Sequence, residues 1–195
     1  MHLRNGEQAP IVALATHIIE DISELCTQMA TINMKDRPME TLTPSALCHH
    51  DRIRVATGRA MEFIDLTERV EALVAGAGIH AGLVNIQSLH TTTAIVVNEH
   101  EPLLLDDFDA LLARTAPSDA LYRHDDMDVR TVNLAPGERP NGHARCRALL
   151  LPSSALLNIA EGRVQLGRWQ RIFLVELDGP RDREVSVLVF GEGVR

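Results

Sequence analysis

Residues 89–101, LHTTTAIVVNEHE, place polar side chains at both ends of an apolar run. The β-branched residues of this run are typical of a β-strand. His90 and Thr92 stand near its start, and Asn98 and Glu99 stand at its end. The strand is therefore either an ordinary one with polar ends, or one whose ends line a site.

Helical patterns flank this strand on both sides. Pro102 opens a segment with apolar side chains at helical spacing, which predicts a helix. Residues 62–78, EFIDLTERVEALVAGAG, predict another helix, with Asp65 and Glu68 resembling a capping box at its start. Between this helix and the quoted strand, residues 83–89 predict a strand.

Strand patterns dominate the rest of the chain, separated by turns such as DGPRD. The predicted strands are 53–57, 129–134, 146–151, 162–166, 171–177 and 185–190. We therefore expect an α+β, β-rich domain, a sandwich of mixed or antiparallel sheets with two helices on one side.

The first 50 residues predict an N-terminal extension. Apolar residues recur at nearly helical spacing between residues 10 and 32 and predict an amphipathic helix that docks on its own domain or on a neighbouring subunit. Residues 33–48 hold two prolines and predict a linker. His49 and His50 predict a solvated loop, and residues 51–195 form the single main domain.

Composition excludes several classes of protein. The net charge of −8 disfavours binding to nucleic acid, and no apolar run is long enough for a membrane span. The N-terminus lacks the pattern of a signal peptide, and the three cysteines suit a reducing cytoplasm. Lys35 is the only lysine beside eighteen arginines, so arginine, histidine, backbone amides or a metal would have to hold an anionic substrate.

Three histidines are candidate metal ligands: His90, His124 and His143. Neutral imidazoles suit a divalent ion such as zinc, and three protein ligands leave one position open for catalysis. Their separations match no compact zinc signature, so the alternative is three histidines with ordinary structural or exposed positions.

Carboxylates and an arginine provide further candidates. Glu99 and Asp107 could serve as general base and metal ligand, or could simply be favourable charges around a helix N-terminus. Arg181, in DGPR, could clamp a phosphate or carboxylate, or could belong to a plain turn.

Seven motifs in order resemble those of the YjbQ family, whose members are often labelled secondary thiamine-phosphate synthases. The resemblance runs from Ile53 to Gly191, and its motifs are HTTT, NE, Asp107, YRH, NGHARCRALL, EGRVQLGRWQ and ELDGPR. It implies a compact β-rich sandwich, a homotrimer and a metal site lined by the motif histidines. It also implies an ability to join a pyrimidine diphosphate and a thiazole phosphate into thiamine phosphate.

The resemblance assigns family positions to individual residues. His90 and His124 match motif histidines, Asn98 and Glu99 match NE, and Asp107 matches the helix aspartate. The later motifs are matched by Gln170, Glu176 and Arg181.

One position departs from the family pattern. The family reads Asn-Ala-His-Ala-His where this chain has residues 141–145, so Arg145 replaces the second histidine and His143 keeps the first. On a strand, residues two apart share a face, so we expect the pair to form a chelate in the family and a weakened one here. Arg145 should pair with a carboxylate such as Glu99 or face a phosphate. The alternative is that His143 replaces the lost ligand and Arg145 turns to solvent.

These patterns lead to two hypotheses. The first is a cytoplasmic, trimeric enzyme with a divalent metal, zinc or magnesium, that acts on a small phosphorylated substrate. Glu99 would be the base, and Arg145 and Arg181 would hold the anion. The alternative is a non-catalytic metal- or ligand-binding trimer with a degenerate site.

Overall fold

The structure, a computed structural model, describes residues 46–193. The predicted helix at residues 10–32 and most of the predicted linker lie outside these residues, and the boundary of the extension stays a prediction. The described elements are, in order, β1 (Ala46–Ala56), β2 (Glu62–Asp65), α2 (Thr67–Gly76), β3 (Ile79–Ser88), β4 (Thr93–Glu99), α3 (Pro102–Thr115), the 3-10 turn η1 (Arg123–Asp125), α4 (Gly142–Leu149), β5 (Ser154–Ala160), β6 (Arg163–Val164), β7 (Gln170–Glu176) and β8 (Asp182–Gly193).

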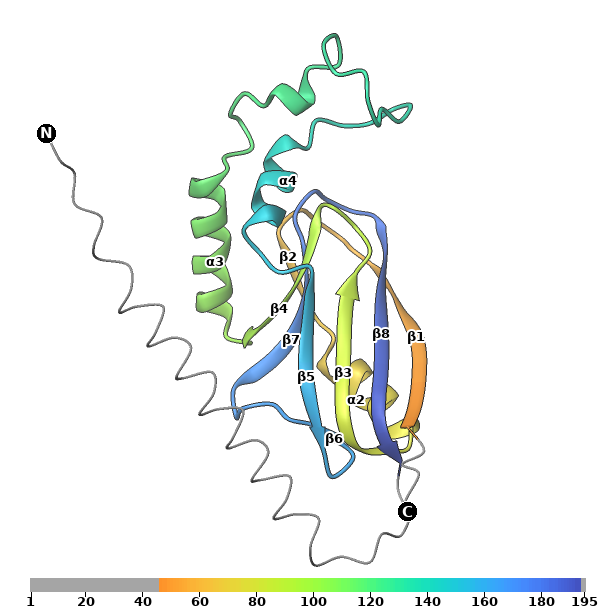
Figure 1. Cartoon of the computed structure of the whole chain (residues 1–195). Helices are drawn as coiled ribbons and strands as arrows, with labels where there is room; N and C mark the ends of the chain where they lie inside the picture. The colour runs from red at the N-terminus through yellow and green to blue at the C-terminus, as the bar shows by residue number, and fades with distance from the viewer. Residues whose placement is uncertain (1–45, 194–195) are drawn as a thin grey trace, which may run out of the picture. The chain divides into compact units, whose positions relative to one another are not determined.

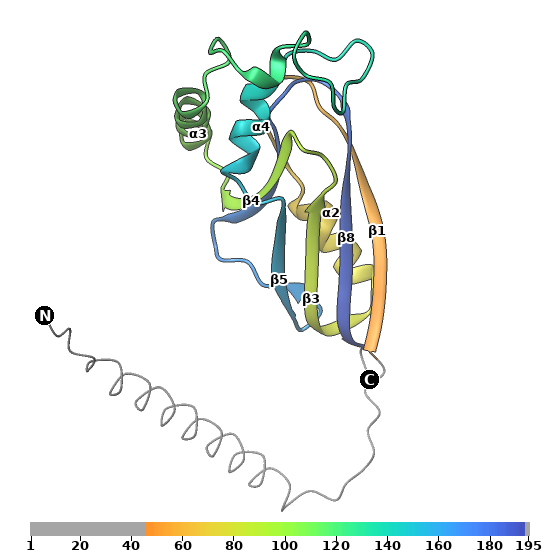
Figure 2. The ribbon, with the colours of Figure 1, turned by 45° about the horizontal axis from the view of Figure 1, so that its top comes forward.

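Two antiparallel sheets form the body of the domain. The first has five strands in the order β1-β8-β3-β5-β6, and the second has three in the order β2-β7-β4. Figure 1 shows β1, β8, β3 and β5 side by side, with α3 and α4 grouped away from them beyond β4, and Figure 2 shows the same grouping from a second direction.

Strand β7 is the centre of the packing because both of its faces are buried. Ile172 and Leu174 belong to a core that the two sheets share with α2. Phe173 and Val175 belong to a second core, closed by side chains of α3 and α4. The domain is therefore layered as sheet, sheet and helix pair, and an uninterrupted apolar sequence in β7 is what such a central strand requires.

Helix α3 begins where the sequence predicts. The carboxylate of Glu101 accepts the backbone N–H groups of Leu103 and Leu104, and Pro102 occupies the first helical position. This helix fixes the exit of β4 and leads into the long segment that ends at α4.

The other predicted helix begins later than its sequence pattern suggests. Residues 62–65 are β2, which pairs with β7, and α2 starts at Thr67. The predicted capping box is wrong, because Asp65 accepts the N–H of Thr67 and Glu68 takes no part. Residues 46–50, predicted as linker and loop, are likewise the first half of β1.

Two predicted strands are absent from the described fold. Residues 146–151 lie largely in α4, whose N-terminus is fastened when Asp125 accepts the N–H groups of Asn141 and Gly142. Residues 129–134 form part of the loop between α3 and α4, where Arg130 bonds the carbonyl groups of His124 and Asn133. Apolar side chains alone do not distinguish a short helix from a short strand.

The α+β, β-rich class and its antiparallel sheets are confirmed. None of the helices between residues 46 and 193 has the length and apolar character needed to cross a membrane.

Candidate functional site

One end of the domain gathers three segments that carry sequence motifs. The turn at residues 89–92 precedes β4, and the turn at residues 177–181 follows β7. These two strands pair with Thr93 opposite Glu176, so both turns lie at the same end. The loop between α3 and α4 reaches this end as well, at the top of Figure 1.

A buried ion pair anchors this end. Glu176 is fully buried and receives two hydrogen bonds of 2.6 Å from Nε and Nη2 of Arg183. Thr57 and the backbone N–H groups of Asp178 and Gly179 also donate to its carboxylate. Burial by itself raises the pKa of Glu176, but these donors, led by Arg183, hold it below its ordinary value. Glu176 is thus a structural anchor of the turn.

Polar contacts run from this anchor towards α4. The carboxylate of Asp178 pairs with Arg181 at 2.8 Å and accepts Nδ2 of Asn141 at 3.4 Å. The side-chain oxygen of Asn141 accepts Nε of Arg145 at 3.1 Å. A chain of hydrogen bonds therefore links the turn after β7 to the helix that carries Arg145.

Arg145 also touches the turn before β4. Its Nη1 donates to Oγ1 of Thr91 at 2.8 Å, and its Nη2 lies 3.5 Å from Oε1 of Glu138. Of the two predicted arrangements of Arg145, this contact corresponds to pairing with a carboxylate, and the partner is Glu138 from the loop and not Glu99. An open pocket of about 320 Å³ lies beside this guanidinium, lined by His90, Thr91, Thr93, Arg145, Ala148, Leu149 and Ser153.

His90 stands in the wall of this pocket, partly buried. Its Nε2 accepts the backbone N–H of Glu184 at 2.8 Å, so the neutral ring carries its proton on Nδ1. Burial, and then the charge of Arg183, lower the pKa of His90. The imidazole is consequently neutral at pH 7.

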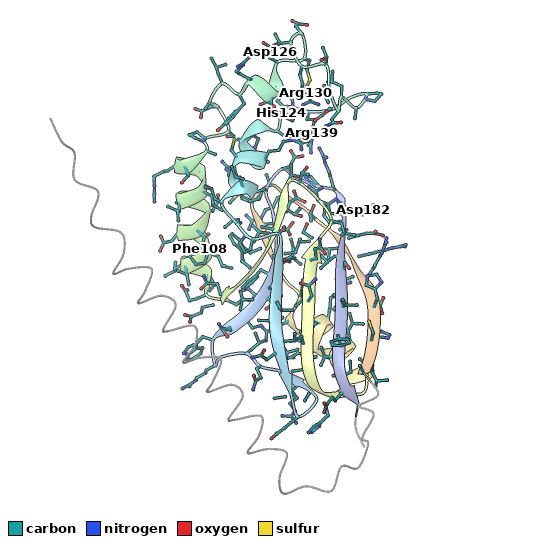
Figure 3. All side chains as sticks on the ribbon, viewed as in Figure 1. Phe108, His124, Asp126, Arg130, Arg139 and Asp182 are labelled. Carbon is teal, nitrogen blue, oxygen red and sulfur yellow. The ribbon has the colours of Figure 1, made fainter. Side chains whose placement is uncertain are left out.

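His124 lies in the loop with two charged neighbours. Figure 3 labels His124, Arg130 and Arg139 together at this end of the domain. Nε2 of His124 accepts from Nη1 of Arg130 at 2.7 Å, and Arg130 also bonds Glu138. The hydrogen bond from Arg130 is the main cause that lowers the pKa of Glu138. Glu138 is therefore ionised and shared by Arg130 and Arg145.

The sequence is similar to those of known proteins. A family model described as UPF0047 protein YjbQ-like matches residues 51–192. The chain belongs to this family. A UPF0047 protein of Methanothermobacter thermautotrophicus is 39% identical over 136 residues, which are 70% of this chain and 87% of that relative. YugU of Bacillus subtilis is 30% identical over 139 residues, 71% of this chain and 97% of its own.

Solved structures agree with the YjbQ-like fold. The crystal structure of a YbjQ-like protein from Sulfolobus solfataricus P2 has a TM-score of 0.68 and 35% identity, and the match covers 75% of this chain and 99% of that chain. A protein from Aeropyrum pernix K1 has a TM-score of 0.65 and 33% identity, with 74% and 99% covered. The resemblance inferred from the motifs is confirmed.

The third predicted ligand, His143, lies on α4. Its ring is 6.4 Å from the ring of Tyr122, and burial followed by the charge of Arg147 lowers its pKa. Since residues 143 and 145 lie on a helix, their side chains point about 160° apart around its axis. The prediction that they share one face as a chelating pair is wrong for this reason.

The donor set of one chain does not fit a common metal ion. Within residues 46–193, no three His, Cys, Asp or Glu side chains are placed to hold an ion together. The Nε2 atoms of His90 and His124 already accept hydrogen bonds. The zinc or magnesium ion stays a prediction, and such a site would need other side-chain positions or ligands from a neighbouring copy.

Four of the candidate residues lie away from the pocket. Asn98 and Glu99 end β4, six residues beyond Thr93, which is about 20 Å along a strand. Gln170 pairs with Glu99, and Asp107 is exposed on α3. The structure therefore brings His90, Thr92, Arg145, Glu176 and Arg181 to one end and leaves these four at another place on the same chain.

Sequence patterns missed the partners that position the pocket residues. Four partners hold the side chains of Arg145, Arg181 and Glu176 in place. These partners are Glu138, Asn141, Asp178 and Arg183. Asp178 and Arg183 flank Arg181 in ELDGPRDR, and this density of charge around a turn was the available signal. Glu138 had no such signal, because its role depends on how the long loop folds.

Proposed function

We propose that the pocket beside His90 and Arg145 binds the phosphate of a small phosphorylated molecule. The supporting observation is the state of Arg145. A guanidinium has five N–H groups, and within residues 46–193 three of them donate, one each to Asn141, Thr91 and Glu138. Two N–H groups remain for a ligand, and the longest of the three contacts, to Glu138, is the easiest to exchange.

The other groups around the pocket suit the same ligand. Thr91, Thr93 and Ser153 bring hydroxyl groups, and the neutral His90 carries a proton on Nδ1. Hydroxyl and imidazole N–H groups are donors to phosphate oxygens, while the pocket wall itself contains no carboxylate. Charge and donor type therefore favour an anion over a cation.

Within this proposal, the reaction is the one that the family resemblance implies, thiamine-phosphate formation from two phosphorylated precursors. Arg145 would stabilise the charge of the departing pyrophosphate. Arg181 stands one step further away, paired with Asp178, and would act by holding the turn in place. The binding step requires no metal in this scheme.

We further propose a homotrimer with the pocket near a subunit boundary. Within one chain, Glu99 and the pocket lie at opposite ends of β4. Glu99 is therefore too far away to act as base on a ligand held by Arg145 of the same chain. A neighbouring copy could bring its own Asn98, Glu99 and Gln170 to the pocket. Edge strand β1, exposed along most of its length, also needs cover.

Binding is tested by calorimetric titration of the full chain with pyrophosphate. Arg145→Met should weaken binding by about 10-fold or more, because a charge-assisted hydrogen bond is lost. Arg163→Met is the matched control, since Arg163 is an exposed arginine on β6. Equal affinity of the wild type and Arg145→Met would contradict the proposal.

The enzymatic reaction is tested separately. The wild-type gene should restore growth without thiamine to a strain that lacks thiamine-phosphate synthase, and the His90→Ala variant should not. If the wild-type gene supports growth no better than the His90→Ala variant does, thiamine-phosphate synthase activity is ruled out.

A non-catalytic binding protein is the second candidate. It is favoured by Arg145 at the position of a family histidine, and by the hydrogen bonds that already occupy Nε2 of His90 and His124. Tight binding of pyrophosphate without complementation would support this alternative.

A further inference from the structure

We propose that Asp65 and His100 form a second reactive centre, at the other end of β4 from the pocket of the same chain, in which His100 acts as nucleophile and general base towards a small ester. Nδ1 of His100 lies 3.0 Å from Oδ2 of Asp65, although the two residues are 35 positions apart in sequence. The pair joins the end of β2 to the residue that follows β4.

The carboxylate of this pair is firmly held. Oδ1 of Asp65 accepts the N–H of Thr67 at 2.9 Å, and Oδ2 accepts Nε of Arg171 at 2.7 Å. Burial raises the pKa of Asp65, but the hydrogen bonds from Thr67, Arg171 and His100 outweigh it and bring the pKa to about 2. Asp65 is thus an anion at neutral pH and holds the proton of the imidazole on Nδ1.

The ring of His100 has a fixed orientation. It packs against the ring of the buried Phe173, with centroids 5.2 Å apart and an interplanar angle of 82°. One ring nitrogen is held by Asp65 and the ring packs against Phe173, while 46% of the side chain remains exposed. Two independent contacts therefore fix the direction in which the lone pair of Nε2 points.

His100 differs in this respect from three of the other histidines of residues 46–193. The Nε2 atoms of His50, His90 and His124 all have hydrogen-bond partners in the described part of the chain. His100 uses only Nδ1 there. A carboxylate that fixes Nδ1–H and an exposed Nε2 are what a general base or nucleophile requires.

Aromatic side chains indicate the substrate class. Phe173 continues into a cluster with Phe63 at 6.2 Å, and Phe63 contacts Phe108 at 6.0 Å. Phe63 and Phe108 are only partly buried, so an aryl group next to His100 would find aromatic surface. We therefore infer a small aryl ester.

The chemical step balances without a cofactor. Nε2 attacks the carbonyl carbon of the ester, the bond from this carbon to the aryl oxygen breaks, and the aryloxide leaves. The imidazole keeps its Nδ1–H on Asp65 throughout. The ring that carries the acyl group is a cation. Water then attacks the acyl carbon, the bond from this carbon to Nε2 breaks, and one proton of the water passes to solvent or to the aryloxide, which releases a carboxylic acid and restores the neutral ring.

The test is hydrolysis of p-nitrophenyl acetate by the full chain at pH 7.5, followed by the release of p-nitrophenolate. His100→Gln should lower the protein-dependent rate by about 10-fold. His80→Gln is the matched control, because His80 is exposed on β3 and should leave the rate unchanged.

Asp65 is a positioning residue in this scheme, and a second readout separates this role from simple stability. Acetate captured on His100 should appear by mass spectrometry after acid quenching in the wild type, and Asp65→Asn should reduce it while Asp65→Glu restores part of it. Equal hydrolysis by the wild type and His100→Gln, or equal labelling of His100 and His80, would overturn the proposal.

Discussion

Arg145 joins three parts of the chain through one guanidinium group. It reaches Thr91 before β4, Asn141 at the start of its own helix and Glu138 in the loop. Its position next to His90 means that the residue at 145 decides which ligand the pocket favours, since a cation there suits an anion and repels a metal.

Arg145→His should raise the affinity for zinc. The substitution removes the positive charge and places a second imidazole in the pocket that contains His90. The affinity is measured by competition with a chromogenic chelator, with Arg163→His as control. An affinity equal to that of the wild type would show that the charge of Arg145 does not limit metal binding.

Sequence patterns at this scale identified the residues but not their partners. His90, Arg145 and Arg181 could be chosen because motifs bring unusual side chains together on short stretches. Glu138 and Asp178 were missed, because a carboxylate becomes a partner only when a distant segment folds against it. Asn98, Glu99 and Gln170 were chosen from the same motifs, but their distance from the pocket follows from the length of β4 and its pairing with β7.

At the scale of elements, the pair Glu176–Arg183 joins β7 of one sheet to β8 of the other. Removing one partner of a buried pair leaves the other charge without compensation.

Glu176→Gln should lower the free energy of unfolding by about 3–5 kcal/mol at pH 7, measured by urea denaturation. Because folding lowers the pKa of Glu176, its contribution is complete above the ordinary value of 4.5 and is lost as the pH falls through the folded value. Wild-type stability should therefore decline on acidification below about pH 4.5 more steeply than that of the variant. Parallel pH profiles would contradict this assignment.

Helix α4 depends on contacts outside itself. Gly142 lies so close to Tyr122 that a Cβ atom would stand 2.5 Å from Cβ of Tyr122. The N-terminus of α4 depends on Asp125, which lies 17 residues before Gly142 in the sequence. A sequence window over ALLL cannot contain that contact, and this is why the segment was predicted as a strand.

Gly142→Ala should displace the segment around Tyr122 while the sheets stay folded. Hydrogen exchange should become faster for residues 122–125 and for the first turn of α4, and unchanged in β3 and β8. Gly76→Ala is the control, since a Cβ atom there meets nothing within 4 Å. Unchanged exchange near Tyr122 would mean that the loop accommodates the methyl group.

At the scale of the whole molecule, strand patterns were sufficient for the class of fold because β-branched residues are abundant and helices are few within residues 46–193. The division into two sheets could not be predicted in this way, since it rests on long-range pairing such as β1 with β8. The doubly buried β7 was recognisable as a strand, but its central place follows only from its partners.

A trimer should have a mass three times that of the 21.5 kDa chain by light scattering at micromolar concentration. We expect trimer formation for two reasons: a neighbouring copy would cover the exposed edge strand β1, and its Glu99 would complete the pocket. A mass near that of one chain would contradict both reasons together.

The contact between Glu138 and Arg145 places a carboxylate against the guanidinium that lines the pocket. A carboxylate tethered beside the guanidinium competes with every incoming anion at high effective concentration. A weak monoanion would rarely displace it, whereas a diphosphate, with more charge and more acceptor oxygens, would. Glu138→Gln should therefore tighten pyrophosphate binding and relax the preference for highly charged ligands, which calorimetry with pyrophosphate and acetate would reveal. If the pocket binds anions as proposed, the tethered carboxylate would set how much charge a molecule needs in order to displace it.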